Sequence, residues 1–208
     1  MVGDWFSQED IGAWEQRYRA SLINSVTGYK PANLIGTRDR LSVHNLAIMS
    51  SVVHLGTSPP LIGLIIRPDS AERHTLRNIR EYGVYTINHV TLSSYRAAHQ
   101  TAARYDDDVS EFEAVGLVPE YRDGFGAPFV ASSPVKFGLS LVEEIPIQWN
   151  GTHFMIGKIE TLFIEQGLVS ATGDLDLVQA NVAALSGLDR YYRTELIDQL
   201  PYAKPGSK

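Results

Sequence analysis

The sequence predicts a mainly β protein, a small β-barrel with helices set between some of its strands. Short runs of apolar and β-branched residues alternate with turn residues along most of the chain. The helical segments are too few and too irregularly placed for repeated β-α-β units. With 208 residues, of which 44% are hydrophobic, a folded surface of about 9,600 Å² would enclose one core. We expect a single domain over residues 1–208, with an N-terminal helix at about 8–27 and a C-terminal extension at about 176–208.

The first expected element is the N-terminal helix. Apolar residues spaced three or four apart from Ile11 to Leu22 share one helix face. Ser7, with Asp10 three residues later, resembles a capping pair, and Gly28 lies just past the end. We expect this helix to pack in the core rather than to carry a function.

About six or seven runs are expected to form strands. The run from Leu61 to Arg67 follows two prolines and is unbroken in its aliphatic character, which predicts a strand covered on both faces. The segment from Val135 to Leu141 alternates apolar residues with others, as a half-buried strand does. The predicted strands span residues 33–37, 44–49, 61–67, 84–88, 135–141 and 155–164.

Further helices are expected between and after the strands. Thr75 is predicted to be the N-cap of a short helix from Leu76 to Tyr82, which Gly83 terminates. The Ala-rich segment 92–103 and the segment 176–192 are also predicted to be helical.

An acidic cluster follows the Ala-rich segment. It lacks the alternating acids, central Gly and closing Glu of a calcium loop, so we expect a solvated loop and no metal site. The acidic residues are Asp106, Asp107, Asp108 and Glu111.

Composition and motifs exclude several functions. The chain has no cysteine, which excludes disulfides, thiolate metal sites and cysteine nucleophiles. Its net charge of −6 argues against a general nucleic-acid partner. We find no export signal and no membrane-spanning run, so we expect a cytoplasmic protein without a membrane partner. Dinucleotide, phosphate-loop, zinc-protease and serine-hydrolase signatures are missing, and the six scattered histidines favour structural roles.

One stretch of small polar residues suggests a ligand site. On an extended segment from Asn45 to Ser51, small side chains let a flat ring approach the backbone, whose N–H and C=O groups can contact its polar edge. Ser50, Ser51 and Arg67 can donate hydrogen bonds to phosphate, and a helix beginning at Thr75 favours an anion. From composition alone, these serines and threonines fit turn and cap positions better than a ligand site.

The order and spacing of several segments resemble the flavin reductase-like family of FMN-binding split barrels. The resemblance covers the chain from about Arg19 to Tyr202. The segments that carry it are Ala32–Thr37, Asn45–Ala47, Ser50–Ser51, Ser58–Leu61, Arg67–Pro68, His74–Ile79, Tyr85–Asn88, Ser110–Phe112, Gly116–Leu117, Asn150–His153, Gly157, Gly187–Asp189 and Tyr192.

This resemblance implies a fold and an activity. Family members form a six-stranded Greek-key split β-barrel, usually a homodimer with FMN near the subunit interface. Many of them are oxidoreductases that transfer a hydride from NADH or NADPH to the flavin, and some supply a partner monooxygenase. The implied electron transfer needs no protein acid or base, so no catalytic residue is assigned.

The resemblance also implies binding residues. Asn45, Leu46 and Ala47 would lie along the isoalloxazine ring, and Thr37 would also reach the flavin. His153 would lie on the nicotinamide side. The implied ligands of the ribityl phosphate are Ser50, Ser51, Arg67 and Thr75.

The sequence leaves alternatives open. The link from Pro68 to His74 is longer than in many relatives, which leaves its phosphate contact undefined. A flavin-binding carrier or scaffold without efficient NAD(P)H turnover would carry the same binding residues. An oxidase of pyridoxamine phosphate would keep the barrel and change the substrate.

Overall fold

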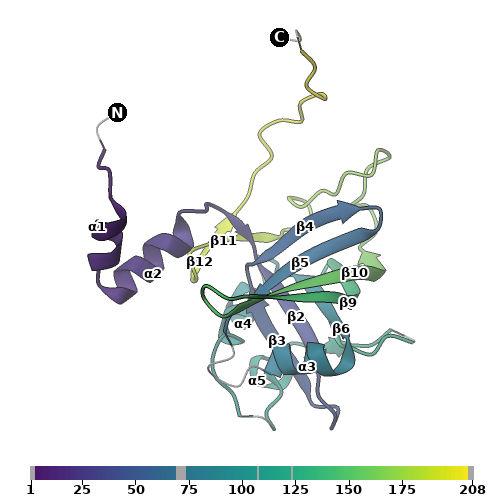
Figure 1. Cartoon of the computed structure of the whole chain (residues 1–208). Helices are drawn as coiled ribbons and strands as arrows, with labels where there is room; N and C mark the ends of the chain where they lie inside the picture. The colour runs from purple at the N-terminus through teal and green to yellow at the C-terminus, as the bar shows by residue number, and fades with distance from the viewer. Residues whose placement is uncertain (1–2, 69–73, 107, 123, 206–208) are drawn as a thin grey trace.

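The structure, a computed structural model, describes residues 3–68, 74–106, 108–122 and 124–205. A seven-stranded antiparallel sheet in the order β3-β2-β6-β9-β10-β5-β4 forms the body of this described chain (Figure 1). Its strands are β2 (Asn33–Arg38), β3 (His44–Met49), β4 (Val52–Thr57), β5 (Pro60–Ile66), β6 (Val84–His89), β9 (Val135–Ile147) and β10 (Thr152–Ile164).

The connection between β3 and β4 makes this sheet a barrel. These two strands are the edges of the sheet, yet only Ser50 and Ser51 separate them in the chain. Two residues span only about 7 Å, so the two edges meet at this turn and the sheet curls round on itself. The Ile65 N–H also donates to the Ser51 carbonyl at 3.3 Å. The predicted split barrel is confirmed, with β4 as a strand beyond the predicted six.

The strand β4 was not predicted because its sequence shows only a weak strand pattern. It is an edge strand, mostly exposed, and its pairing with β5 slips between His54 and Gly56. The prediction for β5 was right in position and wrong in burial. Leu64 and Ile66 are buried, but Ile65 between them is 39% exposed, so only one face of β5 is covered.

Two apolar clusters lie on opposite faces of β2 and its neighbours. Along β2, Leu34 points into one cluster and Ile35 into the other, as the two-residue period of a strand requires. The cluster inside the barrel contains Ile35, Leu64, Ile66, Leu76, Ile79, Tyr85, Ile87, Phe137, Leu139 and Met155. The second cluster contains Ala32, Leu34, Leu46, Val90, Ala98, Phe112, Val130, Ala183 and Leu185.

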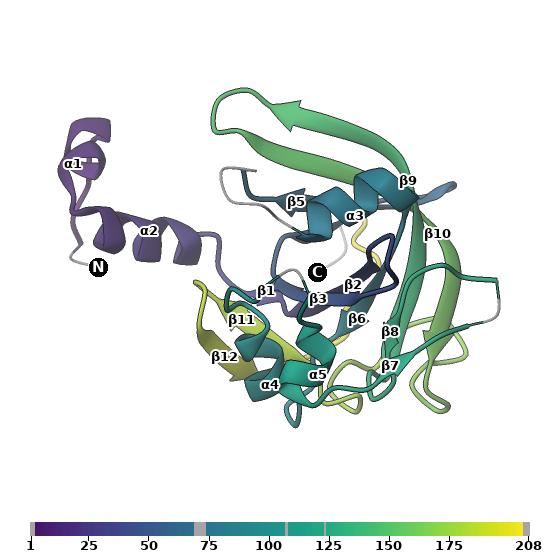
Figure 2. The same ribbon diagram turned by 90° about the horizontal axis from the view of Figure 1, so that it is seen from below.

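The helix α3 (His74–Tyr82) packs against β2 and β3 (Figure 2). Gly83, at φ +67°, terminates it as predicted. The prediction that Thr75 is the N-cap was wrong, because Thr75 already lies inside the helix and is buried. Leu76 and Ile79 fill the barrel core from this helix.

The next helices differ from prediction in length and place. The helix predicted over the Ala-rich segment 92–103 is shorter in the structure, where it is α4 (Tyr95–Gln100). Thr91 and Ser94 form a hydrogen-bonded turn directly before it. The acidic segment ends in α5 (Glu111–Val115), whose first residue is buried rather than solvated. Asp107 lies outside the described residues. The expected loop after α5 contains a two-stranded sheet, β7 (Pro119–Glu120) with β8 (Phe129–Val130).

Two helices replace the single N-terminal helix. They are α1 (Gln8–Ala13), held by the predicted reciprocal Ser7–Asp10 capping, and α2 (Gln16–Ser25). The Glu15 carboxylate accepts from the N–H groups of Arg17 and Tyr18, so the chain restarts a helix at this point. Neither helix contains a buried residue, contrary to the expected core role.

The helix predicted at 176–192 is absent from the described chain, and a β-hairpin occupies its second half. Here β11 (Ala183–Ser186) pairs with β12 (Arg190–Arg193) and with β1 (Lys30–Pro31). Gly187, at φ +65°, opens the turn between β11 and β12. Ala183 and Leu185 fit a helix by propensity, but burial against the second cluster decides their conformation. Among the described helices, none is long and apolar enough to span a membrane.

Candidate functional site

Four buried polar side chains meet where β2, β3 and α3 come together. Asn45 Nδ2 donates to Thr37 Oγ1 and to Thr75 Oγ1, at 3.0 Å in each case. Asn78 Nδ2 donates to the same Thr37 Oγ1 at 3.2 Å. Thr37 and Asn45 are cross-strand partners, and Thr75 and Asn78 lie one turn apart on α3. We call these four residues the amide–hydroxyl cluster.

The amide–hydroxyl cluster leaves one hydrogen-bonding group unused. Asn78 is 1% exposed, and its Oδ1 has no partner among the described residues. A buried unpaired acceptor costs about 1–3 kcal/mol, so a donor from a ligand or a water would be bound favourably here.

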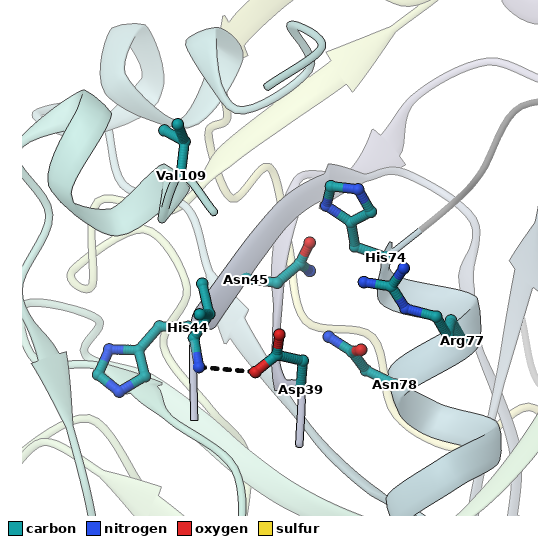
Figure 3. A pocket seen from close by; sticks show the side chains of 8 residues that line it. Asp39, His44, Asn45, His74, Arg77, Asn78 and Val109 are labelled. Carbon is teal, nitrogen blue, oxygen red and sulfur yellow. Dashed lines mark hydrogen bonds between the residues drawn. The ribbon is translucent and has the colours of Figure 1, made fainter. Parts of the chain in front are cut away.

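A small, open pocket adjoins the amide–hydroxyl cluster (Figure 3). Asn45 and Asn78 belong to both, so the cluster supplies part of the pocket wall. Figure 3 shows the side chains of His74 and Arg77 reaching the pocket from α3. On the other side, the Asp39 carboxylate is held by the Val43 N–H at 2.8 Å. The lining residues are Asp39, Val43, His44, Asn45, His74, Arg77, Asn78 and Val109.

The outer edge of β3 is occupied by other side chains. The Leu46 N–H donates to Glu111 Oε2 at 3.0 Å, and the Ile48 N–H donates to Thr101 Oγ1 at 2.9 Å. Burial raises the pKa of Glu111, which is 6% exposed. The sequence had suggested that backbone N–H groups of this segment contact a flat ring. These two N–H groups are not open to a ring, because Glu111 and Thr101 already accept their hydrogen bonds. Leu46 itself is fully buried in the second cluster, whereas Ala47 is half-buried on the face of Asn45.

A second group of predicted residues lies at the other end of β3. Ser51 Oγ donates to the Ile65 carbonyl at 2.6 Å, which fixes the turn that contains Ser50. Arg67 follows directly after β5 and is exposed. Burial, followed by the nearby Arg67 guanidinium, lowers the pKa of the Lys30 ammonium. This end of β3 is therefore rich in hydroxyl groups and positive charge.

The residues predicted to bind phosphate do not form one set. Thr75 contacts Asn45 near the start of β3, whereas Ser50 and Ser51 follow its last residue, Met49. Met49 lies four positions after Asn45 along the strand, which corresponds to about 13 Å. The site consequently has two polar ends joined by the half-buried surface of Ala47 and Met49.

His153 lies in a third polar group, on the β9–β10 hairpin. Its Nδ1 is 2.7 Å from Glu144 Oε1 and 3.2 Å from Arg80 Nη2. Arg80 also donates to both Glu144 oxygens, and these bonds are the main cause that lowers the pKa of Glu144. An ionised Glu144 favours a proton on His153 Nδ1, which leaves Nε2 as the acceptor in the neutral ring.

Sequence reasoning missed several residues of these groups. Asn78 lies three residues after Thr75, and that helical spacing was the available signal. Three further residues contribute through contacts that no local pattern shows. They are Glu111, which contacts Leu46 65 residues away, Glu144, which contacts His153 9 residues away, and Lys30, which contacts Gly187 157 residues away. In the described part of the chain, no three His, Asp or Glu side chains gather as metal ligands do.

Comparison with known proteins agrees with this architecture. Fold and site together define a split-barrel domain with an elongated polar site along one barrel strand. The chain belongs to the flavin reductase like domain family, whose model matches residues 29–181.

Solved structures extend the comparison. A protein from Shewanella frigidimarina, assigned as a flavin reductase with a split-barrel domain, is 52% identical, with 97% of this chain and 100% of that one covered and a TM-score of 0.93. Nitrilotriacetate monooxygenase component B from Bacillus cereus is 19% identical, with 95% and 100% covered and a TM-score of 0.84. An FMN-binding protein from Thermus thermophilus is 16% identical, with 84% and 91% covered and a TM-score of 0.69. The last two comparisons support the fold alone.

Proposed function

We propose that this chain binds FMN and transfers a hydride from NADH or NADPH to flavin. The observation that carries the proposal is the pair of polar ends along β3 in a chain of the flavin reductase like family. FMN is an elongated ligand with a phosphate at one end and a hydrogen-bonding ring edge at the other. When bound, it supplies the redox chemistry, and the protein supplies position and electrostatics.

The residues at the two ends fit the two ends of this cofactor. Arg67 provides positive charge two residues after Ile65, whose carbonyl accepts from the Ser51 hydroxyl, and the Lys30 ammonium lies near Arg67. Positive charge and hydroxyl groups together suit a phosphate. At the other end, the unpaired Asn78 Oδ1 is an acceptor suited to a ring N–H.

The remaining predicted residues have narrower roles in this proposal. Asn45 and Thr37 contact the ring end, and Thr75 positions the Asn45 amide through its hydroxyl. Ala47 offers a small side chain to the ring face. Of Leu46 only the backbone carbonyl is left for such a role, since its side chain lies in the second cluster and its N–H donates to Glu111.

On the nicotinamide side, His153 orients NADH or NADPH. Glu144 holds a proton on its Nδ1 and so directs Nε2 as an acceptor for a carboxamide N–H. We further propose that the reduced flavin serves a partner monooxygenase; one protein of the same fold is named nitrilotriacetate monooxygenase component B. We place this activity in a cytoplasmic homodimer.

The visible absorption spectrum of the purified protein tests the proposal. It is recorded after desalting, after adding FMN, and again after adding NADH or NADPH in the absence of oxygen. A flavin band that survives desalting and bleaches with the nicotinamide supports the proposal. A retained band that neither nicotinamide bleaches would favour the carrier alternative, and a protein that does not retain FMN would refute the cofactor assignment.

A further inference from the structure

The turn between β9 and β10 contains Asn150 followed directly by Gly151. Asparagine is among the chemically labile side chains, and of the seven asparagines in the chain Asn150 alone precedes a glycine. Both residues are exposed, and the neighbouring Trp149 is 99% exposed. Figure 2 shows the long hairpin that ends in this turn. The turn is therefore open to water, and its geometry determines how readily Asn150 reacts with its own backbone.

An Asx turn folds the Asn150 side chain back along the chain. The Thr152 N–H, two residues further on, donates to Asn150 Oδ1 at 3.1 Å. The ring closed by this hydrogen bond contains both Asn150 Cγ and the Gly151 nitrogen, so an electrophilic carbon and a nitrogen are held within one tight turn. Gly151, at φ +70°, has no side chain to shield that nitrogen.

Two donors converge on the oxygen of the Asn150 side chain. Thr152 Oγ1 donates to Asn150 Oδ1 at 2.7 Å, beside the bond from the Thr152 N–H. Attack on Asn150 Cγ would turn this oxygen into an oxyanion, and donors already aimed at it stabilise the tetrahedral intermediate of acyl transfer. Thr152 therefore supplies a small oxyanion hole to a side chain of its own turn. Because the turn is exposed, each donor contributes less than it would in a closed site.

One hydrogen bond opposes a reaction at this turn. The Gly151 N–H donates to the Ile147 carbonyl at 2.9 Å, and this bond must open before the nitrogen can attack. Exposed turns open locally at a much lower free energy than the core of a protein. Local opening of the turn therefore limits the reaction, which is expected to be slow.

We propose that Asn150 is a self-modification site, at which Thr152 promotes deamidation through a succinimide. The Gly151 nitrogen forms a bond to Asn150 Cγ, the bond from Cγ to Nδ2 breaks, and ammonia leaves with the proton of the Gly151 N–H. Water then opens the ring at either carbonyl and gives aspartate or isoaspartate, so no oxidant or reductant is needed.

The modification would change the hairpin in two ways. Either product adds a carboxylate three residues before His153, and isoaspartate also lengthens the backbone at the turn that pairs Ile147 with Thr152. The proposal concerns the chain's own covalent chemistry and holds whether or not the chain reduces flavin.

Incubation of the full chain near pH 8, followed by peptide mapping, tests the proposal. Trypsin should release residues 137–158, a fragment in which Asn150 is the only asparagine. We expect this fragment to acquire the Asn-to-Asp mass change and to split into aspartyl and isoaspartyl forms on reversed-phase chromatography. Thr152→Val should slow the change about two- to tenfold, the range for one lost hydrogen bond, whereas Thr152→Ser should keep the parent rate.

Two controls separate the effect of the turn from other causes. Thr172→Val, which removes a hydroxyl from an exposed turn elsewhere, should leave the rate unchanged. Asn181, which is exposed and precedes Val182, should stay intact under the same conditions. A synthetic peptide of residues 137–158 should react equally fast with and without Thr152→Val, because it lacks the ordered turn.

Two results would overturn the proposal. One is an equal rate for Thr152→Val and the parent in the folded chain, which would show that the Thr152 hydroxyl does not promote the reaction. The other is a folded chain that stays unmodified at Asn150 while the synthetic peptide is converted, which would show that the turn protects this residue.

Discussion

Thr75 Oγ1 accepts a hydrogen bond from Asn45 Nδ2 at 3.0 Å, and this contact places the Thr75 side chain of α3 beside the start of β3. The same Asn45 amide reaches Thr37, whose hydroxyl also serves Asn78. Two hydroxyls, those of Thr37 and Thr75, therefore link the barrel wall to α3. The geometry of this end of the site depends on both acceptors, and Thr37 serves two donors.

Replacing Thr37 by Val should destabilise the fold. The change leaves the buried N–H groups of Asn45 and Asn78 without the Thr37 oxygen, at a cost of about 1–3 kcal/mol. Urea denaturation measures the loss of unfolding free energy. Thr57→Val, at an exposed position of β4, is the control and should change it little. A Thr37→Val protein as stable as the parent would show that the hydroxyl is dispensable.

Arg67→Ala should weaken FMN binding about ten- to a hundredfold, the range for losing a charged hydrogen-bond partner. Riboflavin, which lacks the phosphate, should bind the variant and the parent equally. Arg77→Ala at the pocket end of the site is the informative comparison. If Arg77→Ala, rather than Arg67→Ala, removes the preference for FMN over riboflavin, the phosphate lies at the pocket end. Fluorescence titration with both flavins measures these affinities.

His153→Ala should raise KM for NADH or NADPH more than it changes FMN occupancy. Glu144→Gln should act in the same direction, because it removes the carboxylate that holds the proton on His153 Nδ1. Steady-state kinetics with saturating FMN separates the two effects. A loss of bound FMN with an unchanged KM would remove His153 from the nicotinamide side.

His89 should make the fold sensitive to acid. Burial lowers the pKa of His89 from 6.5 to about 4, and its Nδ1 has no partner among the described residues. Between these two pH values the unfolded chain binds a proton that the folded chain does not. Stability should therefore fall as pH drops from 6.5 toward 4, by up to about 3 kcal/mol.

The variant His89→Leu tests this acid sensitivity. Urea denaturation at pH 7 and near pH 4.5 should show a smaller difference in the variant than in the parent. His54→Leu, at an exposed position, is the control and should keep the parent's pH dependence. An unchanged slope in His89→Leu would contradict the assignment.

Tyr85→Phe should leave stability unchanged or raise it by about 1 kcal/mol. The Tyr85 hydroxyl is buried in the barrel with no partner among the described residues, and burial raises its pKa. Gly157→Ala should destabilise by about 1–3 kcal/mol, because its Cβ would overlap that hydroxyl. Combining the two changes should recover part of the loss, and thermal denaturation measures all three. The absence of any recovery would show that other neighbours of Gly157 set the cost.

Local chemistry explains what the sequence predicted correctly. Ser7 with Asp10 and the stop at Gly83 act within one helical turn, so they could be recognised without knowing the fold. The run 61–66 formed a strand because its aliphatic character is strong. The contacts that the sequence did not predict are those between residues far apart along the chain.

The hairpin β11–β12 and Glu111 show why the rest was not predictable. The apolar residues of β11 form a strand because β1 and β12 flank them, and β1 lies more than 150 residues earlier. Glu111 belongs to an acidic run, yet it is buried because it caps the Leu46 N–H on the edge strand. The sequence analysis likewise assigned Thr75 to the same phosphate site as Ser50 and Ser51. Spacing along the sequence does not show that the Thr75 side chain contacts Asn45, near the other end of β3.

The turn at Ser50 and Ser51 has a consequence for how the molecule responds to a ligand. It is the seam at which the two edges of the sheet are joined, and it is also one end of the candidate site. A ligand held at this turn would tie the two edges together, and its binding free energy would add to that of the closed barrel. Opening the seam would require releasing the ligand first, so cofactor loss and unfolding would follow one path in this protein.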